Sequence, residues 1–283
     1  MRWRIGDVTI TKVTEMEVTG GSRFLLPQAT REAILPIAWL RPHFADETGR
    51  LRMSIHAFVV ETPTRRIVVD TCLGNHKQGR RIPGWNDLNL PFLEDLAAAG
   101  YPRESIDTVL CTHLHVDHVG WNTMKLGDRW VPTFPRARYL MGRAEHAHWI
   151  GPHDREDMRT IFADSVQPVF DAGLVDLVET DHRICDEISL IPTLGHTPGH
   201  VSLRIVSRGE EALITGDFLH HPCQIAHPEW SSTADWNAAQ AEATRRRMYE
   251  ALADRPVLVL GTHFAGATAG WLKRDGNTWR LDV

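Results

Sequence analysis

The chain carries the stretch Thr-His-Leu-His-Val-Asp-His from Thr112 to His118, directly after an apolar, strand-like run. Neutral imidazole is the commonest metal ligand in proteins, and carboxylates join it in sites that mix nitrogen and oxygen ligands. In an extended loop His113 and His115 point to the same side, because side chains alternate with a period of two. Asp117 and His118 are neighbours in sequence and point in different directions. The stretch is therefore expected to offer two ligands to each of two metal ions.

Three further strand-like runs lead into a Gly that is followed within two residues by His or Asp. Residues 188–192 lead to Gly195-His196, residues 212–215 to Gly216-Asp217, and residues 257–260 to Gly261-Thr262-His263. Strand ends are where rigid scaffolds place active-site groups. With the first stretch, the chain offers seven potential ligands: His113, His115, Asp117, His118, His196, Asp217 and His263.

Seven ligands are about the number that two four- or five-coordinate metals need when they share one carboxylate. We assign to one metal His113, His115 and His196, to the other Asp117, His118 and His263, and to both, as a bridge, Asp217. A lone His-x-His is weak evidence for a metal, whereas four separated motifs together are specific. No cysteine takes part, which favours a hydrolytic metal site over a structural zinc site.

The composition is that of an ordinary soluble globular protein: 283 residues, 42% hydrophobic and 24% charged. A net charge of −5 without a basic stripe argues against nucleic acid as a partner. No apolar run approaches membrane-spanning length, and the N-terminus lacks the apolar core of a signal peptide, so no membrane partner and a cytoplasmic location are expected. The four widely spaced cysteines indicate reduced, buried thiols. The run Arg245-Arg246-Arg247 is interpreted as a solvated helix face.

Hydrophobic patterning predicts strands at residues 8–13, 55–60, 66–70, 106–111, 138–141, 188–192, 201–206, 212–215 and 257–260, and helices at residues 88–99, 144–150 and 234–253. Ser232 or Thr233 is a plausible cap of the last helix. We expect a single domain over residues 1–283. Residues 20–52 look irregular, with several Gly and Pro, and a loop this long usually covers a site or mediates contacts such as dimerisation.

The motifs resemble those of the metallo-β-lactamase superfamily in type, order and approximate spacing. They are His113-x-His115-x-Asp117-His118, Gly195-His196-Thr197-Pro198-Gly199-His200, Gly216-Asp217 and Gly261-Thr262-His263. The resemblance covers the chain from about residue 55 onward. It implies an α/β fold, a four-layer αβ/βα sandwich with a dimetal site at one edge between two sheets. Two Zn²⁺ suit the ligands, and Mn, Fe or Co could occupy the same set.

The residues around Asp217 indicate which branch of the superfamily the chain resembles most. Three residues after this Asp, N-acyl-homoserine lactonases carry a Tyr, whereas this chain carries His220. Asp-x-x-His followed by Gln224 and then Pro228-Glu229 looks more like the methyl parathion hydrolase branch, which includes lactonases and aryl esterases with promiscuous phosphotriesterase activity. The resemblance implies a metal-dependent hydrolase of a small-molecule ester, a lactone or an aryl ester, acting through a hydroxide that bridges the metals. His220 is the candidate catalytic donor to the oxyanion or leaving group, and Asp117 a second candidate that handles the proton.

Two alternatives stay open. The same site could hydrolyse a phosphotriester or an aryl halide, or the chain could be a metal-stabilised binding module without activity. Other residues carry smaller predictions. His200 is expected to be a supporting or structural imidazole, and Asp70 either to orient a ligand or to cap a turn. His146 and His148 are expected to lie on a helix surface. Pocket-lining candidates are Trp39, Phe44, Trp121 and Trp149.

Overall fold

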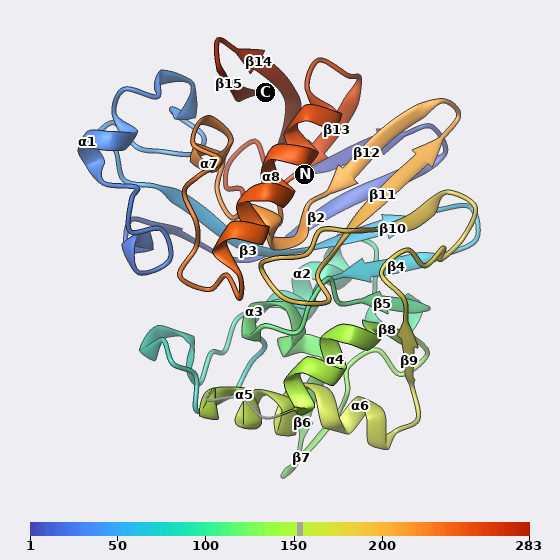
Figure 1. Ribbon diagram of the computed structural model, residues 1–283. Coiled ribbons are helices and arrows are strands. Elements are labelled where there is room, and N and C mark those ends of the chain that lie inside the picture. The colour runs from blue at the N-terminus through green and yellow to red at the C-terminus, as the bar shows by residue number, and fades with distance from the viewer. Residues whose placement is uncertain (152–154) are drawn as a thin grey trace. The chain divides into compact units, whose positions relative to one another are not determined.

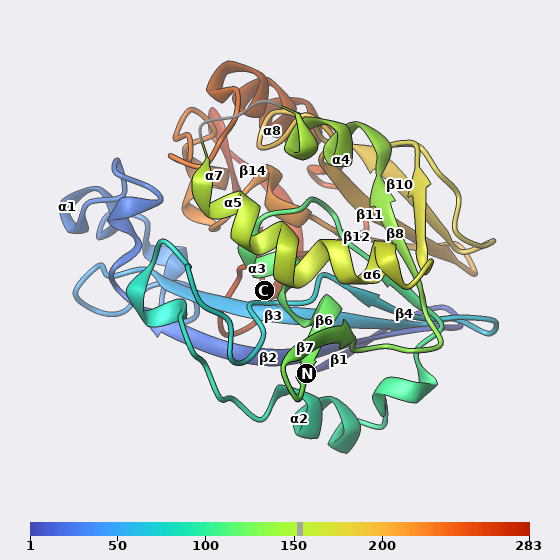
Figure 2. The same cartoon turned by 90° about the horizontal axis from the view of Figure 1, so that it is seen from below.

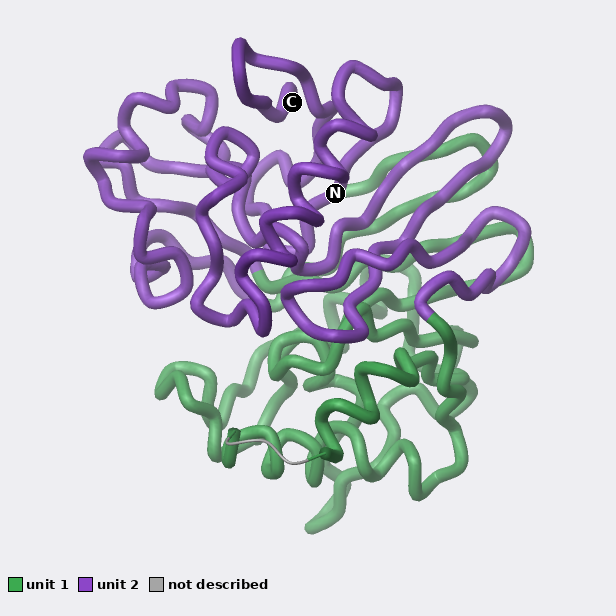
Figure 3. The backbone as a smooth tube through the Cα atoms, in the orientation of Figure 1, with its two compact units in different colours: residues 1–15, 55–179 green, residues 16–54, 180–283 purple. Residues whose placement is uncertain are grey.

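A computed structural model describes the chain over residues 1–151 and 155–283. The chain forms two compact units, coloured separately in Figure 3. Unit 1 comprises residues 1–15 and 55–179, and unit 2 comprises residues 16–54 and 180–283. The chain therefore passes from one unit to the other three times. Within the described residues, no helix is both long enough and apolar enough to cross a membrane.

Unit 1 is built on a seven-stranded mixed sheet. Its strands, in sheet order, are β1 (Arg2–Ile5), β2 (Val8–Thr19), β3 (Arg52–Glu61), β4 (Arg66–Val69), β5 (Thr108–Leu110), β8 (Arg138–Gly142) and β9 (Val175–Val178). The last four run parallel to one another. Residues 53–60 of β3 are all buried, which explains why the apolar residues 57–60 follow one another without alternating with polar ones.

Helices cover both faces of this sheet, as Figure 2 shows: α2 lies on one side, and α4, α5 and α6 lie on the other. Their bounds, with those of the short α3, are α2 (Phe92–Ala98), α3 (Val116–Val119), α4 (Arg143–Ile150), α5 (Glu156–Ile161) and α6 (Gln167–Asp171). A π-helical turn at Phe162–Val166 joins α5 to α6. A separate hairpin consists of β6 (Thr123–Leu126) and β7 (Arg129–Pro132). Helix α2 buries Phe92 and Leu96, α5 buries Met158 and Ile161, and α6 buries Val169.

Unit 2 contains a six-stranded sheet in which only β12 and β13 pair in parallel. Its strands, in sheet order, are β10 (Ile188–Pro192), β11 (Val201–Ser207), β12 (Glu210–Ile214), β13 (Val257–Leu260), β14 (Ala269–Asp275) and β15 (Thr278–Asp282). Helix α8 (Ala238–Leu252) lies along this sheet (Figure 1). Its buried residues recur every three or four positions, the spacing that puts them on one face: Ala241, Thr244, Arg245, Met248, Tyr249 and Leu252. The short helix α7 (Cys223–Ala226) precedes it.

The irregular segment at residues 20–52 packs into the core of unit 2. It contains one short helix, α1 (Arg31–Ile34). Leu26, Leu40 and Phe44 are fully buried and belong to the same apolar cluster as Met248 and Tyr249 of α8. Burial of these side chains explains how a long segment with little secondary structure is held in one conformation.

The start of α8 differs from the prediction. The helix begins at Ala238 rather than at residue 234, and Asn237 is the cap, since its side chain accepts a hydrogen bond from the backbone N of Gln240 at 3.0 Å. The hydroxyl of Ser232 instead accepts the N–H of Ala234 at 3.0 Å and closes a turn before the helix. Ser and Asn can each cap a helix or close a turn, so sequence alone could not choose between them.

Candidate functional site

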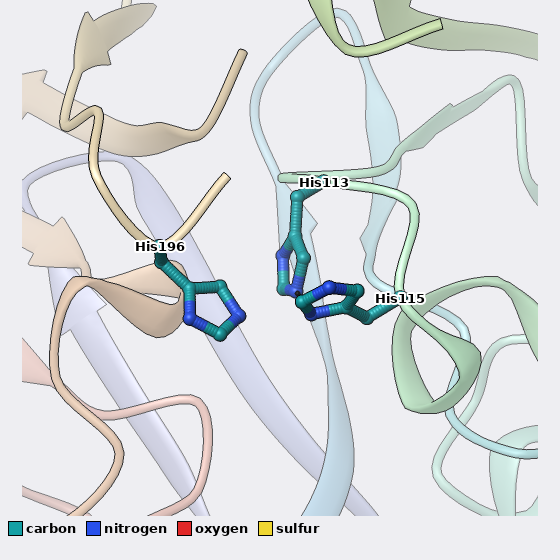
Figure 4. A group of neighbouring side chains, drawn as sticks. All are labelled: His113, His115 and His196. Atoms are coloured by element: carbon teal, nitrogen blue, oxygen red, sulfur yellow. Dashed lines mark hydrogen bonds between the residues drawn. The ribbon is translucent and has the colours of Figure 1, made fainter. Parts of the chain in front are cut away.

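Of the seven predicted ligands, four lie in unit 1 and three in unit 2. His113, His115, Asp117 and His118 lie in unit 1, where the loop after β5 leads into α3. The Nε2 atom of His113 lies 3.1 Å from Nδ1 of His115, and Figure 4 shows these two rings side by side. The ring centroids of His113 and His118 are 4.0 Å apart. All three imidazoles are buried, whereas the Asp117 side chain is 15% exposed. The structure thus gathers this part of the predicted set as expected.

A buried carboxylate at the end of β4 holds this loop. Asp70 accepts the backbone N–H of Thr112 at 2.8 Å and its hydroxyl at 2.9 Å. The same carboxylate lies 2.9 Å from Nδ1 of His118, which leaves Nε2 of that ring on the side of Asp117, 3.8 Å from Oδ1. Asp70 therefore orients His118, which is the first of the two roles considered for it from the sequence.

One further carboxylate holds the ligand loop and another holds a tryptophan just after it, and the sequence analysis missed both. Glu145 of α4 accepts the backbone N–H of Leu114 at 3.1 Å and the indole N–H of Trp149 at 2.7 Å. Glu15 accepts two backbone N–H groups and the indole N–H of Trp121, the last at 2.7 Å. Burial raises the pKa of Glu15. Trp121 and Trp149, predicted as pocket residues, are thus buried partners of carboxylates, a role that no local sequence pattern signals.

The other three predicted ligands lie in unit 2 at one edge of the six-stranded sheet. Strand β11 is antiparallel to both β10 and β12, and β13 is parallel to β12. Strands β10, β12 and β13 therefore all point the same way, and their carboxyl ends meet at one edge. The loops that leave those ends carry His196, Asp217 and His263. This confirms the prediction that strand ends deliver these residues.

The Asp217 carboxylate lies among three buried imidazoles of its own unit. Its Oδ2 atom is 3.2 Å from Nε2 of His263, 3.2 Å from Nε2 of His220 and 3.7 Å from Nε2 of His196. The ligand atoms of His196, Asp217 and His220 all lie within 4.8 Å of one another. Imidazole nitrogens and carboxylate oxygens at such distances form the donor set of a divalent transition metal.

The far sides of two of these rings are tied to the protein. Nδ1 of His196, a ring labelled in Figure 4, lies 2.9 Å from Oδ1 of Asp235. Nδ1 of His263 lies 3.0 Å from the carbonyl oxygen of Ser54. Both acceptors favour the tautomer with hydrogen on Nδ1, which leaves the Nε2 lone pair on the side of Asp217. Asp235 was absent from the predicted site, because it lies 39 residues from its partner in the chain.

His200 has the supporting role predicted for it. Its Nε2 accepts the backbone N–H of Asp217 at 2.6 Å, so Nδ1 carries the hydrogen and donates to the hydroxyl of Thr193 at 2.9 Å. Gly216 makes this contact feasible: its φ is +57°, and a Cβ there would lie 2.6 Å from Nε2 of His200. Only glycine therefore fits directly before the proposed bridging carboxylate, because any side chain would collide with His200.

The prediction for the arginine run is wrong at Arg245. Its side chain is fully buried, because it lies four residues after the buried Ala241 on the inner face of α8. Nε donates to the carbonyl oxygen of Pro228 at 2.8 Å, and Nη1 lies 3.5 Å from Oδ2 of Asp235. Arg246 and Arg247 are exposed, as expected.

Three smaller predictions have mixed outcomes. His146 and His148 lie on α4 as predicted, but both are only partly exposed: the His146 ring packs 4.5 Å from that of Phe170, and the His148 ring 4.7 Å from that of Trp149. Phe44 is a core residue of unit 2, with its ring 5.8 Å from that of Phe264. Trp39 packs against the same cluster.

Comparisons with known proteins agree with this description. The family model described as "Metallo-beta-lactamase superfamily" matches residues 51–273. An N-acyl homoserine lactonase of Bacillus sp is 24% identical over 167 residues, which are 55% of this chain and 59% of that protein. The probable metallo-hydrolase YflN of Bacillus subtilis (strain 168) is 25% identical over 158 residues, covering 46% of this chain and 58% of that protein. The chain thus spans about three fifths of the length of these curated relatives.

Solved structures show the fold. AidC, a dizinc quorum-quenching lactonase in complex with a product, N-hexnoyl-L-homoserine, superposes with a TM-score of 0.82 at 20% identity, covering 99% of this chain and 96% of that one. The hydrolase AbOPH superposes with a TM-score of 0.81 at 23% identity, covering 100% and 96%. The predicted metallo-β-lactamase-like α/β fold is confirmed, and the named relatives support the lactonase-like branch. By its four motifs, by its fold and by a family match over most of its length, the chain belongs to the metallo-β-lactamase superfamily.

Proposed function

We propose that this protein is a dinuclear metal hydrolase that opens an ester, with a lactone as the first candidate and an aryl ester as the second. The observation that carries the proposal is the Asp217 carboxylate among the Nε2 atoms of three buried imidazoles. A buried carboxylate of this kind is favourable when a cation shares the space. The lactonases among the relatives support the choice of a lactone.

The donor set fits two metals. We propose that one is held by His113, His115 and His196, the other by Asp117, His118 and His263, and that Asp217 bridges them. Each unit contributes imidazoles whose outer nitrogen is already fixed: His118 by Asp70, His196 by Asp235 and His263 by the carbonyl of Ser54. Such partners hold a ring in the tautomer and orientation that a metal needs.

Bound divalent cations would lower the pKa of a water so that hydroxide is available near neutral pH. The residues around the cations have their own tasks. Asp117 is the more exposed of the two carboxylates, and we assign it the proton that the reacting water releases. Asp217 is held through its backbone by His200 and through its carboxylate by the imidazoles, so it stays in place while substrate enters.

His220 is assigned to the substrate rather than to the metal. Its Nε2 lies 3.2 Å from Asp217, yet its Nδ1 has no hydrogen-bond partner among the described residues, unlike Nδ1 of His196 and His263. A ring that the protein does not fix on its far side suits a donor to the developing oxyanion or the leaving group better than a metal ligand. The variant H220A should keep its metal and lose about 10²–10⁴-fold in kcat. Loss of metal from H220A would make His220 a ligand instead.

The decisive experiment combines metal analysis with a substrate panel. Purified protein should carry about two metal ions per chain by elemental analysis. The panel comprises an N-acyl homoserine lactone, a p-nitrophenyl ester, a phosphotriester and a chloroarene. We expect the highest kcat/KM for the lactone, and dominance of the phosphotriester or the chloroarene would replace the ester proposal.

Variants H113A and D217A should lose both metal and hydrolysis. The matched control is H227A, because His227 is a partly exposed histidine of unit 2 that contacts Glu229 and Trp230 and lies outside the proposed ligand set. An H113A or D217A protein that is metal-free and still active would contradict the ligand assignment. A metal-loaded wild type without activity on any member of the panel would favour a metal-stabilised binding module.

A further inference from the structure

A chain of buried polar groups in unit 2 links helix α8 to the proposed ligand His196. The side chains of Arg245 and Asp235 are each 0% exposed, and that of His196 is 1% exposed. Oδ1 of Asp235 lies 2.9 Å from Nδ1 of His196, while Oδ2 lies 3.5 Å from Nη1 of Arg245. Oδ2 also accepts the backbone N–H of Ser232 at 3.0 Å. Each oxygen of the carboxylate therefore has its own partners.

Arg245 also holds the backbone around these residues. Its Nε donates to the carbonyl oxygen of Pro228 at 2.8 Å, and Nη2 donates to the hydroxyl of Ser231 at 3.1 Å. Nη1 additionally lies 3.4 Å from the carbonyl oxygen of Phe218, the residue after Asp217. The planar guanidinium, with five N–H donors, can reach all of these acceptors at once, whereas a lysine ammonium cannot.

The charges explain why an arginine is buried here. A carboxylate removed from water is unfavourable unless a cation and hydrogen bonds compensate it. Arg245 supplies the cation on one side of Asp235, so the other oxygen is available to accept the Nδ1 hydrogen of His196. A carboxylate behind a metal-binding imidazole fixes the tautomer and the ring orientation and raises the basicity of the other nitrogen.

We propose that Arg245 is a positioning residue that sets the metal affinity of His196 through Asp235. The inference rests on the proposed metal centre, since it assigns His196 a metal. A merely structural arginine would behave differently. Its loss would lower the stability of the fold and leave the metal affinity of His196 unchanged. Arg246 next to it is the natural contrast: it is exposed and pairs with Glu242 on the same helix at 2.8 Å.

The test is a double-mutant cycle on metal affinity. D235N, R245M and D235N/R245M are prepared with the full chain, together with R245K and the control R246M. Zn²⁺ affinity is measured by competition with a chelator, ligand geometry by the visible absorption of bound Co²⁺, and the thermal midpoint on metal-free protein. D235N and R245M should each lower the affinity for one Zn²⁺ by about 10–100-fold. The double variant should fall no further than D235N alone.

The other variants sharpen the expectation. R245K keeps the charge and loses the planar fork, so its Zn²⁺ affinity should lie between those of wild type and R245M. R246M should match wild type in affinity and in Co²⁺ spectrum. The Co²⁺ spectrum of D235N should change, because a differently oriented imidazole alters the ligand field.

Four results would overturn the inference. The first is an R245M protein with a lower thermal midpoint and unchanged Zn²⁺ affinity. The second is a drop of about tenfold or more from D235N to D235N/R245M, which is measurable even if R245M alone does not fold, because the double variant leaves no unpaired buried charge. The third is that wild type and every variant bind two Zn²⁺ with equal affinity. This result would contradict the role of Arg245 but not the proposed metal centre. The fourth is a wild type that binds no Zn²⁺, which overturns the metal centre as well.

Discussion

Replacing Gly195 by alanine should destabilise unit 2 and displace the adjacent His196. Gly195 has φ +128°, and a Cβ there would lie 2.3 Å from the backbone N of Ala241 and 2.5 Å from its Cα. Ordinary contacts begin at 3.4 Å, so the loop and the start of α8 would have to separate by about 1 Å. Backbone strain of about 1–3 kcal/mol and overpacking of about 1–3 kcal/mol predict a total loss of about 2–6 kcal/mol.

The assay is urea unfolding of metal-free protein, followed by Zn²⁺ competition on the folded variant. The matched control is G209A, because Gly209 also has a positive φ, +83°, but its added Cβ would meet nothing within 4 Å. G209A should therefore lose only the free energy of unfolding that a non-glycine residue at positive φ costs, about 1–2 kcal/mol, and it should keep the wild-type Zn²⁺ affinity. G195A should lose more stability and bind one Zn²⁺ more weakly. A G195A protein within about 1 kcal/mol of G209A, with unchanged Zn²⁺ affinity, would refute the steric reasoning.

Three further predictions follow from buried groups. The variant F44A should lower the free energy of unfolding by about 3–5 kcal/mol, because Phe44 is fully buried. The control F24A, at a residue that is 56% exposed, should change the free energy of unfolding by less than about 0.5 kcal/mol. Equal losses in urea unfolding would contradict the core role of residues 20–52. The variant D70N should weaken Zn²⁺ binding by about 10–100-fold in chelator competition, because Asp70 orients His118, and an unchanged affinity would remove that role. Burial lowers the pKa of Lys77 from 10.5 to about 7, so between these values the unfolded chain binds more protons and folding becomes more favourable as pH rises. The unfolding free energy of wild type minus that of K77M should therefore grow from pH 7 to pH 9, by at most about 1.4 kcal/mol per pH unit, and a pH-independent difference would disprove the shift.

Much of the fold and of the ligand set was predictable because its signals are local. Apolar runs predicted the strands β3, β10 and β13, and the Gly-His and Gly-Asp pairs behind such runs marked the loops that carry the ligands. Such a motif consists of a strand end, a Gly and a metal-binding side chain, and all of it lies within a few adjacent residues of the sequence. The supporting role of His200 was also accessible, since it lies in the same short loop as His196.

The partners of the ligands depend on residues far apart in the chain. Asp235 lies 39 residues from His196, and the carboxylate of Glu15 reaches Trp121 across 106 residues. Arg245 shows the same limit: three arginines in a row predict a charged surface, and only the packing of α8 against the loops around Phe218, Pro228 and Asp235 buries one of them.

The sequence by itself determined the strands that lead into the ligand loops, the residue types of the candidate ligands and the superfamily, since each of these depends on patterns within short segments. Only the tertiary structure decided which carboxylate stands behind each imidazole, which arginine is buried, and that residues 20–52 belong to the core of unit 2. The physical reason is that the free energy of a buried charge or ring depends on the groups that surround it after folding, and those groups come from segments whose meeting no local pattern records.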